Sequence, residues 1–180
     1  MAVLLHWLVA AAVVAQVVLG IWMTGLPDTP RGLQAGWFNL HKSTGIVLFA
    51  LIGVRLAWRA RHAPPPWPRI LPRWERHVAA VNHRLLYLCL LLAPASGFLG
   101  SSFSRYPVRL FGWPLPRWIE PWPLGKEWMS RVHEAVAWLL VLLVAVHVAA
   151  ALRHAWRRDG VFTRMTWRRA APPRSAKEQP

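Results

Sequence analysis

The chain has 180 residues, of which 55% are hydrophobic, and it carries a formal net charge of +15 and thirteen tryptophans. So apolar a chain would be hard to keep in solution. Its basic residues cluster between apolar segments rather than over a polar surface, which excludes a nucleic-acid-binding protein and is typical of a membrane protein.

Four segments are apolar and long enough to cross a bilayer, which takes roughly 20 helical residues. They run over about residues 2–23, 40–58, 78–100 and 132–152. The first could be a signal peptide, but it lacks a basic start and a small-residue cleavage site and holds His6, so we expect a retained helix. The predicted fold is all-α: an integral membrane four-helix bundle, in a single domain over residues 1–170.

The connecting segments differ in composition. Residues 26–30 read Leu-Pro-Asp-Thr-Pro and predict a turn, whereas residues 63–68 read Ala-Pro-Pro-Pro-Trp-Pro and predict a stiff, extended connector. Residues 101–131 are rich in proline and tryptophan, which predicts a cap in the interfacial layer. Residues 171–180 predict a disordered tail. The single cysteine, Cys89, lies in an apolar run and is interpreted as packing.

The basic residues predict how the bundle is oriented in the membrane, because cytoplasmic loops are enriched in Lys and Arg. One side carries fifteen of the 22 basic residues: Arg55, Arg59, Arg61, Arg69, Arg73, Arg76, Arg84, Arg153, Arg157, Arg158, Arg164, Arg168, Arg169, Arg174 and Lys177. The other side carries seven: Arg31, Lys42, Arg105, Arg109, Arg117, Lys126 and Arg131. We therefore expect both termini in the cytoplasm.

Histidines are the unusual feature of the apolar segments. His62, His77 and His154 lie in basic stretches, but five others fall inside or at the edge of an apolar segment: His6, His41, His83, His133 and His147. Ionisable residues at such positions are costly and usually face a site or the bundle interior. Each of these histidines could instead form a hydrogen bond with a backbone carbonyl or reach the membrane interface. This alternative explains a single histidine better than it explains five in one four-helix protein.

The spacing of His133 and His147 places both on one face of a helix. Fourteen residues at about 100° each fall about 40° short of four full turns, and they span about 21 Å along the axis. Two ligands so placed could each hold an iron porphyrin, one near each leaflet. Depth in the membrane then pairs His6 with His147 on the cytoplasmic side and His41 with His133 on the outer side. His83 has no partner in this scheme.

Zinc fits this pattern less well than haem. Zinc takes three or four closely grouped protein ligands, whereas depth splits these histidines into two distant groups. A haem iron needs only one neutral imidazole above it and one below. The residues therefore predict two haem b groups, with His6 and His147 as ligands of one and His41 and His133 as ligands of the other.

Several short stretches, in this order and spacing, resemble the bacterial cytochrome b561 family of four-helix dihaem proteins, whose characterised member is a superoxide oxidase. They are Leu5–Leu8, Asn39–Gly45, Pro64–Pro66, Asn82–Tyr87, Pro94–Gly97, Phe111–Gly112, Val132–Glu134 and Val146–His154. The similarity runs from about Leu4 to Met165. The chain departs from the family in its very short amino terminus, which weakens the local topology signal but leaves the ligand positions unaffected.

The resemblance implies that His6, His41, His133 and His147 are haem ligands. It also implies that His83 and His154 lie near a cytoplasmic-side site for ubiquinone, where Arg84 could help to hold the quinone head group. It further implies a multi-pass protein of the bacterial inner membrane that oxidises superoxide on the periplasmic side and passes the electrons to ubiquinone. For His83 the alternative is a buried hydrogen bond within the bundle, and for His154 a solvated basic helix end.

Positive charge on the outer face would raise the encounter rate of a small anion such as superoxide. We assign this steering to Lys42, Arg105 and Arg109, although such charges could equally bind lipid phosphate or haem propionates. Two other functions stay open. The protein could be a cytochrome b anchor that passes electrons from a dehydrogenase or hydrogenase partner to quinone, or a haem-free membrane scaffold.

Overall fold

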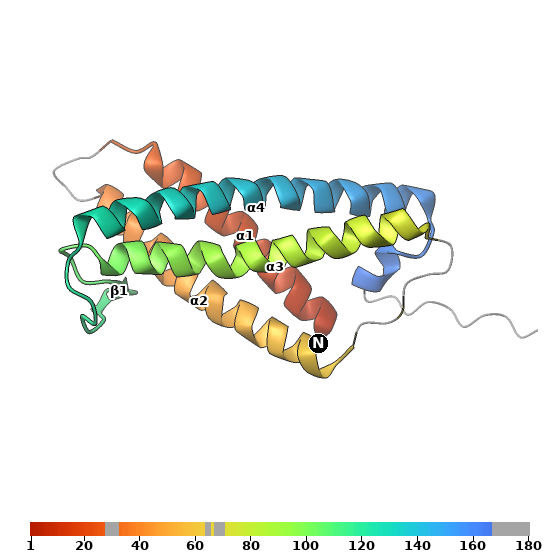
Figure 1. The fold of residues 1–180 in the computed structure, drawn as a ribbon, viewed down its shortest axis with the longest axis horizontal. Coiled ribbons are helices and arrows are strands. Elements are labelled where there is room, and N and C mark those ends of the chain that lie inside the picture. The colour runs from red at the N-terminus through yellow and green to blue at the C-terminus, as the bar shows by residue number, and fades with distance from the viewer. Residues whose placement is uncertain (28–32, 64–65, 67–70, 167–180) are drawn as a thin grey trace, which may run out of the picture.

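The computed structural model describes residues 1–27, 33–63, 66 and 71–166. Its elements are helices α1 (Ala2–Thr24), α2 (Leu33–Arg61), α3 (Arg73–Ser102) and α4 (Pro123–Arg157), strands β1 (Arg109–Leu110) and β2 (Trp113–Pro114), and the short 3-10 helix η1 (Phe162–Met165). The four long helices run alternately up and down in one bundle (Figure 1), which confirms the predicted all-α, four-helix fold. The disordered tail predicted at residues 171–180 lies outside the described residues.

All four long helices are long and apolar enough to cross a membrane, so the protein is a multi-pass membrane protein. Three of them extend well beyond the spans predicted from hydropathy. In α4, Pro123 stands in the first turn, where a proline costs no helical hydrogen bond, and the helix continues to Arg157. Hydropathy marks only the part of a helix that lies in hydrocarbon, so the polar first and last turns are invisible to it.

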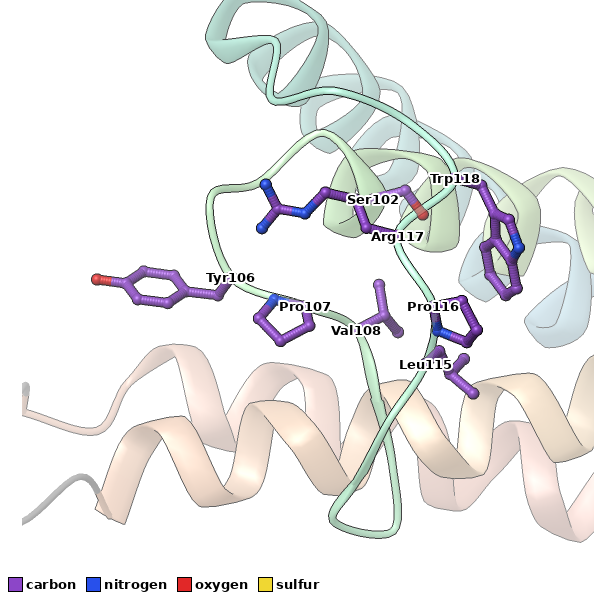
Figure 2. Close-up of a pocket in the computed structure, with 8 residues that line it drawn as sticks. All are labelled: Ser102, Tyr106, Pro107, Val108, Leu115, Pro116, Arg117 and Trp118. Atoms are coloured by element: carbon purple, nitrogen blue, oxygen red, sulfur yellow. The ribbon is translucent and has the colours of Figure 1, made fainter.

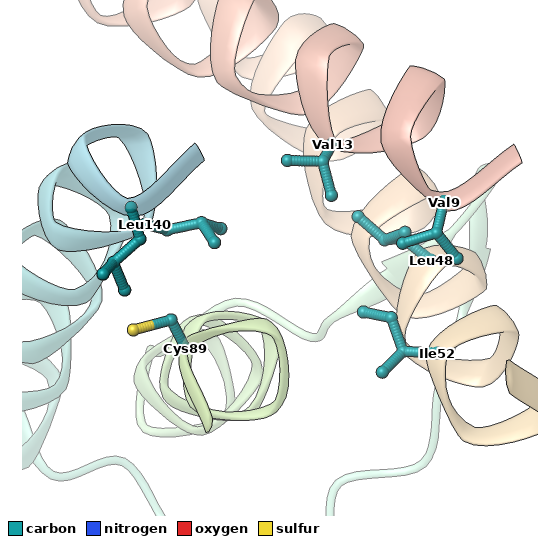
Figure 3. Close-up of a cluster of buried hydrophobic side chains, with 7 residues drawn as sticks. Val9, Val13, Leu48, Ile52, Cys89 and Leu140 are labelled. Carbon is teal, nitrogen blue, oxygen red and sulfur yellow. The ribbon is translucent and has the colours of Figure 1, made fainter. Parts of the chain in front are cut away.

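The hydrophobic core lies halfway along the bundle. A cluster of seven buried side chains joins all four helices there (Figure 3): Val9, Val13, Leu48, Ile52, Cys89, Leu140 and Leu143. Ile52 is fully buried and Cys89 is 2% exposed, so the cysteine acts as a small apolar packing residue. Many other large apolar side chains of the helices face outward, as a lipid-facing surface requires. The polar residues that matter for function lie above and below this cluster.

One end of the bundle, here called the hairpin end, is closed by β1 and β2. The connecting residues Phe111 and Gly112 both have positive φ, at 48° and 95°, which is the backbone of a two-residue type I′ turn. A phenylalanine rarely adopts that conformation, and Ser43 of α2 holds it there. The Ser43 hydroxyl accepts a hydrogen bond from the Phe111 N–H at 2.8 Å and donates to the Asn39 carbonyl at 2.8 Å. The sequence analysis did not predict this hairpin.

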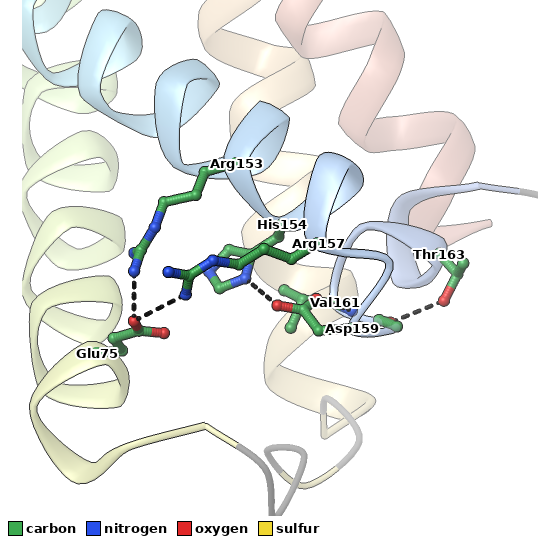
Figure 4. Close-up of polar contacts among 8 residues, drawn as sticks. Glu75, Arg153, His154, Arg157, Asp159, Val161 and Thr163 are labelled. Carbon is green, nitrogen blue, oxygen red and sulfur yellow. Dashed lines mark hydrogen bonds and ion pairs between the residues drawn. The ribbon is translucent and has the colours of Figure 1, made fainter.

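The opposite end, here called the terminal end, carries Met1 and η1 (Figure 1). Glu75 at the start of α3 pairs with Arg153 at 2.9 Å and with Arg157 at 3.7 Å (Figure 4). The indole N–H of Trp7 donates to the Met165 carbonyl at 2.8 Å, which fastens η1 to α1. The first and last described parts of the chain therefore meet at the same end, whichever side of the membrane that end faces.

The Ser43 contact can be tested with Ser43→Ala. The substitution removes the acceptor of the Phe111 N–H, so the turn should open and exchange of the Phe111 amide hydrogen should accelerate at least several-fold. Hydrogen–deuterium exchange of residues 103–122 measures this. Ser102→Ala is the matched control, because the Ser102 hydroxyl donates only within its own helix, to the Phe98 carbonyl. Unchanged exchange in Ser43→Ala would show that Ser43 does not hold the hairpin.

Candidate functional site

Two histidines from different helices face each other near the hairpin end. The ring centres of His41 (α2) and His133 (α4) are 6.2 Å apart, and the two ring planes are nearly perpendicular, at 88°. Both side chains are half-buried. These are the two residues that membrane depth paired on the outer side, and the structure brings them together.

The ring of His133 is held by α3. Its Nδ1 lies 2.7 Å from the Ala93 carbonyl, and because a carbonyl can only accept, Nδ1 carries the proton and donates it. Nε2 is then the nitrogen with a free lone pair. Gly97, one turn further along α3, makes room for the ring, since a Cβ there would lie only 3.0 Å from Nδ1. The Pro94–Gly97 stretch of α3 therefore helps to set the position of the His133 ring.

The ring of His41 is seated against α1. A Cβ at Gly20 would lie 3.3 Å from the His41 Cε1, so this glycine also makes room for an imidazole. One turn before Gly20, the amide of Gln16 donates from Nε2 to the His41 carbonyl at 3.0 Å. The other polar atoms of these two side chains, Gln16 Oε1 and His41 Nδ1, are buried and have no hydrogen-bond partner among the described residues.

Three histidines meet near the terminal end. The ring centres of His6 (α1) and His147 (α4) are 6.1 Å apart, with 58° between the planes. His83 (α3), which the depth argument left without a partner, lies with its ring centre 5.2 Å from that of His147. Its Nδ1 donates to the Ala79 carbonyl of its own helix at 2.7 Å. His83 is thus half-buried beside the terminal-end couple, its Nδ1 engaged by the backbone.

Arg55 and Tyr87 complete the surroundings of the terminal-end couple. A guanidinium nitrogen of Arg55 lies 3.1 Å from His6 Nδ1, and the Arg55 Nε donates to the Tyr87 hydroxyl at 3.2 Å. The sequence analysis assigned no role to Arg55, Tyr87 or Gln16 at a site. The sequence could have identified Gln16 and Arg55 as candidate site residues, because each is a polar residue inside a predicted membrane span.

The geometry of each couple suits one metal ion between two imidazoles. A metal–nitrogen bond of about 2 Å on each side, plus roughly 1 Å from each nitrogen to its ring centre, puts the ring centres about 6 Å apart. The two couples have 6.1 and 6.2 Å. Among the described residues, no group of three or more His, Cys, Asp or Glu side chains could hold a metal ion. The residues present therefore fit two bis-imidazole haem sites better than a zinc site.

The remaining predicted site residues lie at the two ends. At the terminal end, Arg84 is exposed, and His154 is paired through Nδ1 with the Asp159 carboxylate at 2.5 Å (Figure 4). Burial favours a raised pKa for Asp159, but the hydrogen bonds from His154 and from the Val161 N–H outweigh it and lower that pKa. His154 is thus not a simply solvated helix end.

At the hairpin end, Lys42 is half-buried next to His41, whereas Arg105 and Arg109 are exposed. A small pocket lies under the same loop (Figure 2), lined by Ser102, Tyr106, Pro107, Val108, Leu115, Pro116, Arg117 and Trp118. It contains none of the paired histidines and a single charged side chain, so it is a packing feature of the loop rather than the candidate site.

Comparison of the sequence with known proteins shows the family of this chain. The chain matches the family described as "Prokaryotic cytochrome b561" over residues 1–168. It is 33% identical over 167 residues to Cytochrome b561 homolog 2 of Escherichia coli (strain K12), covering 89% of this chain and 86% of that protein. It is 27% identical over 146 residues to Cytochrome b561 homolog 1 of the same organism, covering 74% and 83%. With four apolar helices and this match across nearly its whole length, the chain belongs to the prokaryotic cytochrome b561 family of membrane electron-transfer proteins.

Proposed function

We propose that the protein is a dihaem b-type cytochrome of the bacterial inner membrane that oxidises superoxide on the periplasmic side and reduces ubiquinone on the cytoplasmic side. The observation that carries the proposal is the pair of imidazole couples, at 6.1 and 6.2 Å, on opposite sides of the buried cluster at mid-bundle. The excess of basic residues beside the terminal end orients that end, with both termini, toward the cytoplasm.

Haem b, when bound, supplies a one-electron carrier at each couple. His6 and His147 would hold one haem, and His41 and His133 the other. With two imidazoles holding each haem, the group would carry electrons rather than bind oxygen. At the hairpin end the Ala93 carbonyl keeps the proton of His133 on Nδ1, so Nε2 stays available as a ligand.

The overall reaction balances as two one-electron oxidations and one two-electron reduction. Two superoxide anions each lose one electron and become dioxygen, and ubiquinone gains two electrons and two protons and becomes ubiquinol. At the terminal end, His83 and Arg84 would hold the quinone head group. The hydrogen-bonded pair of His154 Nδ1 and Asp159 Oδ2 can hold a proton between them close to that end.

Positive charge at the hairpin end supports superoxide as the donor. Lys42 lies directly after His41 in the chain, and Arg105 and Arg109 are exposed on the loop at this end. Of the other cations there, Arg131 is neutralised by Glu127 at 2.6 Å. Lys42, Arg105 and Arg109 form no ion pair within the part of the chain that the structure describes, and their charge would attract a small anion toward the His41–His133 couple.

The second candidate function is a cytochrome b anchor for a dehydrogenase or hydrogenase. The exposed aromatic side chains of the hairpin-end loop favour it, since Tyr106 is 82% and Trp113 is 79% exposed. Aromatic residues of this kind suit a protein interface as well as a lipid interface. Copurification of a second subunit in a one-to-one ratio would favour the anchor over the superoxide oxidase.

The ligand assignment predicts the effect of His133→Ala. About half of the bound haem should be lost, or become high-spin, while the haem at the other couple stays low-spin. A haem assay per chain combined with optical spectroscopy measures this, and His147→Ala should remove the other half. The exposed His77 serves as control, and His77→Ala should keep all haem. A His133→Ala protein with full low-spin haem would refute the assignment.

The steering assignment predicts the effect of Lys42→Ala combined with Arg105→Ala. The rate of haem reduction by superoxide should fall on the order of 10-fold at low ionic strength, and its salt dependence should flatten. Stopped-flow kinetics at several salt concentrations measures both. Arg61→Ala combined with Arg73→Ala, two exposed cations at the terminal end, is the charge-matched control. An unchanged rate with unchanged salt dependence would show that these residues do not steer the substrate.

A further inference from the structure

Arg55 is a cation of a membrane-spanning helix that has no acidic partner among the described residues. Its Nε donates to the Tyr87 hydroxyl at 3.2 Å, and within the described part of the chain its guanidinium makes one other hydrogen bond, to His6 Nδ1. A second cation, Arg59, lies over the same Tyr87 ring, 5.4 Å from its centre. Of the described residues at this end, Glu75 pairs with Arg153 and Arg157, and Asp159 pairs with His154. A charge at this depth is costly unless an anion compensates it.

The contact between Arg55 and His6 cannot persist once His6 is a metal ligand. Guanidinium only donates, so His6 Nδ1 must accept from it and the ring proton must sit on Nε2. An imidazole that binds iron through Nε2 carries its proton on Nδ1 instead and donates from there. Ligation by His6 therefore frees one edge of the Arg55 guanidinium, while Tyr87 still holds Nε.

We propose that Arg55, supported by Arg59, binds a propionate carboxylate of the haem held by His6 and His147. The inference rests on the proposed function and adds an anion-binding site to it. Haem b carries two carboxylates, and an arginine held at one edge can present its other N–H groups to a carboxylate with paired hydrogen bonds. A propionate bound to Arg55 would compensate the positive charge of the arginine. It would also replace the contact with His6 Nδ1 that ligation by His6 removes.

The test replaces the carboxylates of the ligand as well as the arginine. Full-length protein depleted of haem is titrated with haem b or with its dimethyl ester, in wild type, Arg55→Gln and Arg55→Lys. The wild type should prefer the free acid at the His6–His147 site by about 10-fold or more, and Arg55→Gln should lose most of that preference. Arg55→Lys should retain part of it. The exposed Arg61 is the control, and Arg61→Gln should leave the preference unchanged.

The outcomes separate the two proposals. If wild type and Arg55→Gln discriminate equally between acid and ester while both bind two haems, the role of Arg55 is wrong and the dihaem proposal stands. If the wild type binds no haem at this couple, the dihaem proposal fails as well. Should Arg55→Gln not fold, resonance Raman bands of the propionate groups must differ between wild type and Arg55→Lys, and identical bands would overturn the role of Arg55.

A second, independent observation concerns Gln16. Its Nε2 donates to the His41 carbonyl, which leaves its Oε1 for another contact. Gln16 Oε1 and His41 Nδ1 are both buried, and neither has a hydrogen-bond partner among the residues that the structure describes. Iron bound at His41 Nε2 would leave Nδ1–H in need of an acceptor, as Ala93 provides for His133. The geometry points to Gln16 as the positioning residue of His41, with Oε1 accepting from Nδ1–H in the haem-bound protein.

An acceptor at Nδ1 makes the imidazole a stronger donor to iron and stabilises the ferric state. Gln16→Leu should therefore raise the midpoint potential of the haem at His41 and His133 and leave the other haem unchanged. Thr44→Val is the control, because it removes only a hydroxyl that contacts the same His41 carbonyl at 3.3 Å. A redox titration that finds no shift in Gln16→Leu, with both haems present, would overturn this role.

Discussion

The cost of placing an imidazole inside a membrane bundle is the constraint on which the rest of this structure depends. A polar ring at that depth needs a partner. The Ala93 and Ala79 carbonyls accept from His133 and His83, and Arg55 donates to His6. Helices that are distant in the sequence also bring four of the rings together in two couples. His41 faces His133 and His6 faces His147, each at a separation that suits one metal ion between two rings. At the hairpin end small residues make this approach possible, since Gly20 and Gly97 stand where a larger side chain would meet the rings of His41 and His133.

The two ends of the bundle are built for different tasks. The hairpin end is closed by a short sheet whose strained turn is fastened to α2 through Ser43, two residues after His41. The terminal end is held by Glu75 with Arg153 and by a hydrogen-bonded acid–base pair, His154 and Asp159. The first end has exposed cations on the loop near its histidine couple, whereas the second, on whose side most of the basic residues lie, gathers histidines, arginines and a tyrosine around its couple. This asymmetry fits a protein that takes electrons from an anion on one side and delivers electrons with protons on the other.

Much of the fold was predictable because membrane helices carry their signal in composition. The four spans, and the depth at which each histidine lies, follow from hydropathy and from the rise of a helix, and the structure brings together the same histidines that depth had paired. The hairpin was not predicted, because its turn depends on a hydrogen bond between Phe111 and Ser43, 68 positions apart. Likewise, Gln16 and Arg55 acquire a role only when α1 and α2 are placed against each other. His154 depends on Asp159, five residues later, on the far side of a helix end that hydropathy does not locate.

The central claim is that two irons are each held between two imidazoles. Haem content per chain, measured together with the electron paramagnetic resonance spectrum of the fully oxidised protein, tests it most directly. We expect two haem b groups per chain and two low-spin ferric signals, the more anisotropic one from the couple whose ring planes stand at 88°. A single haem per chain, or a high-spin signal from an intact site, would contradict it.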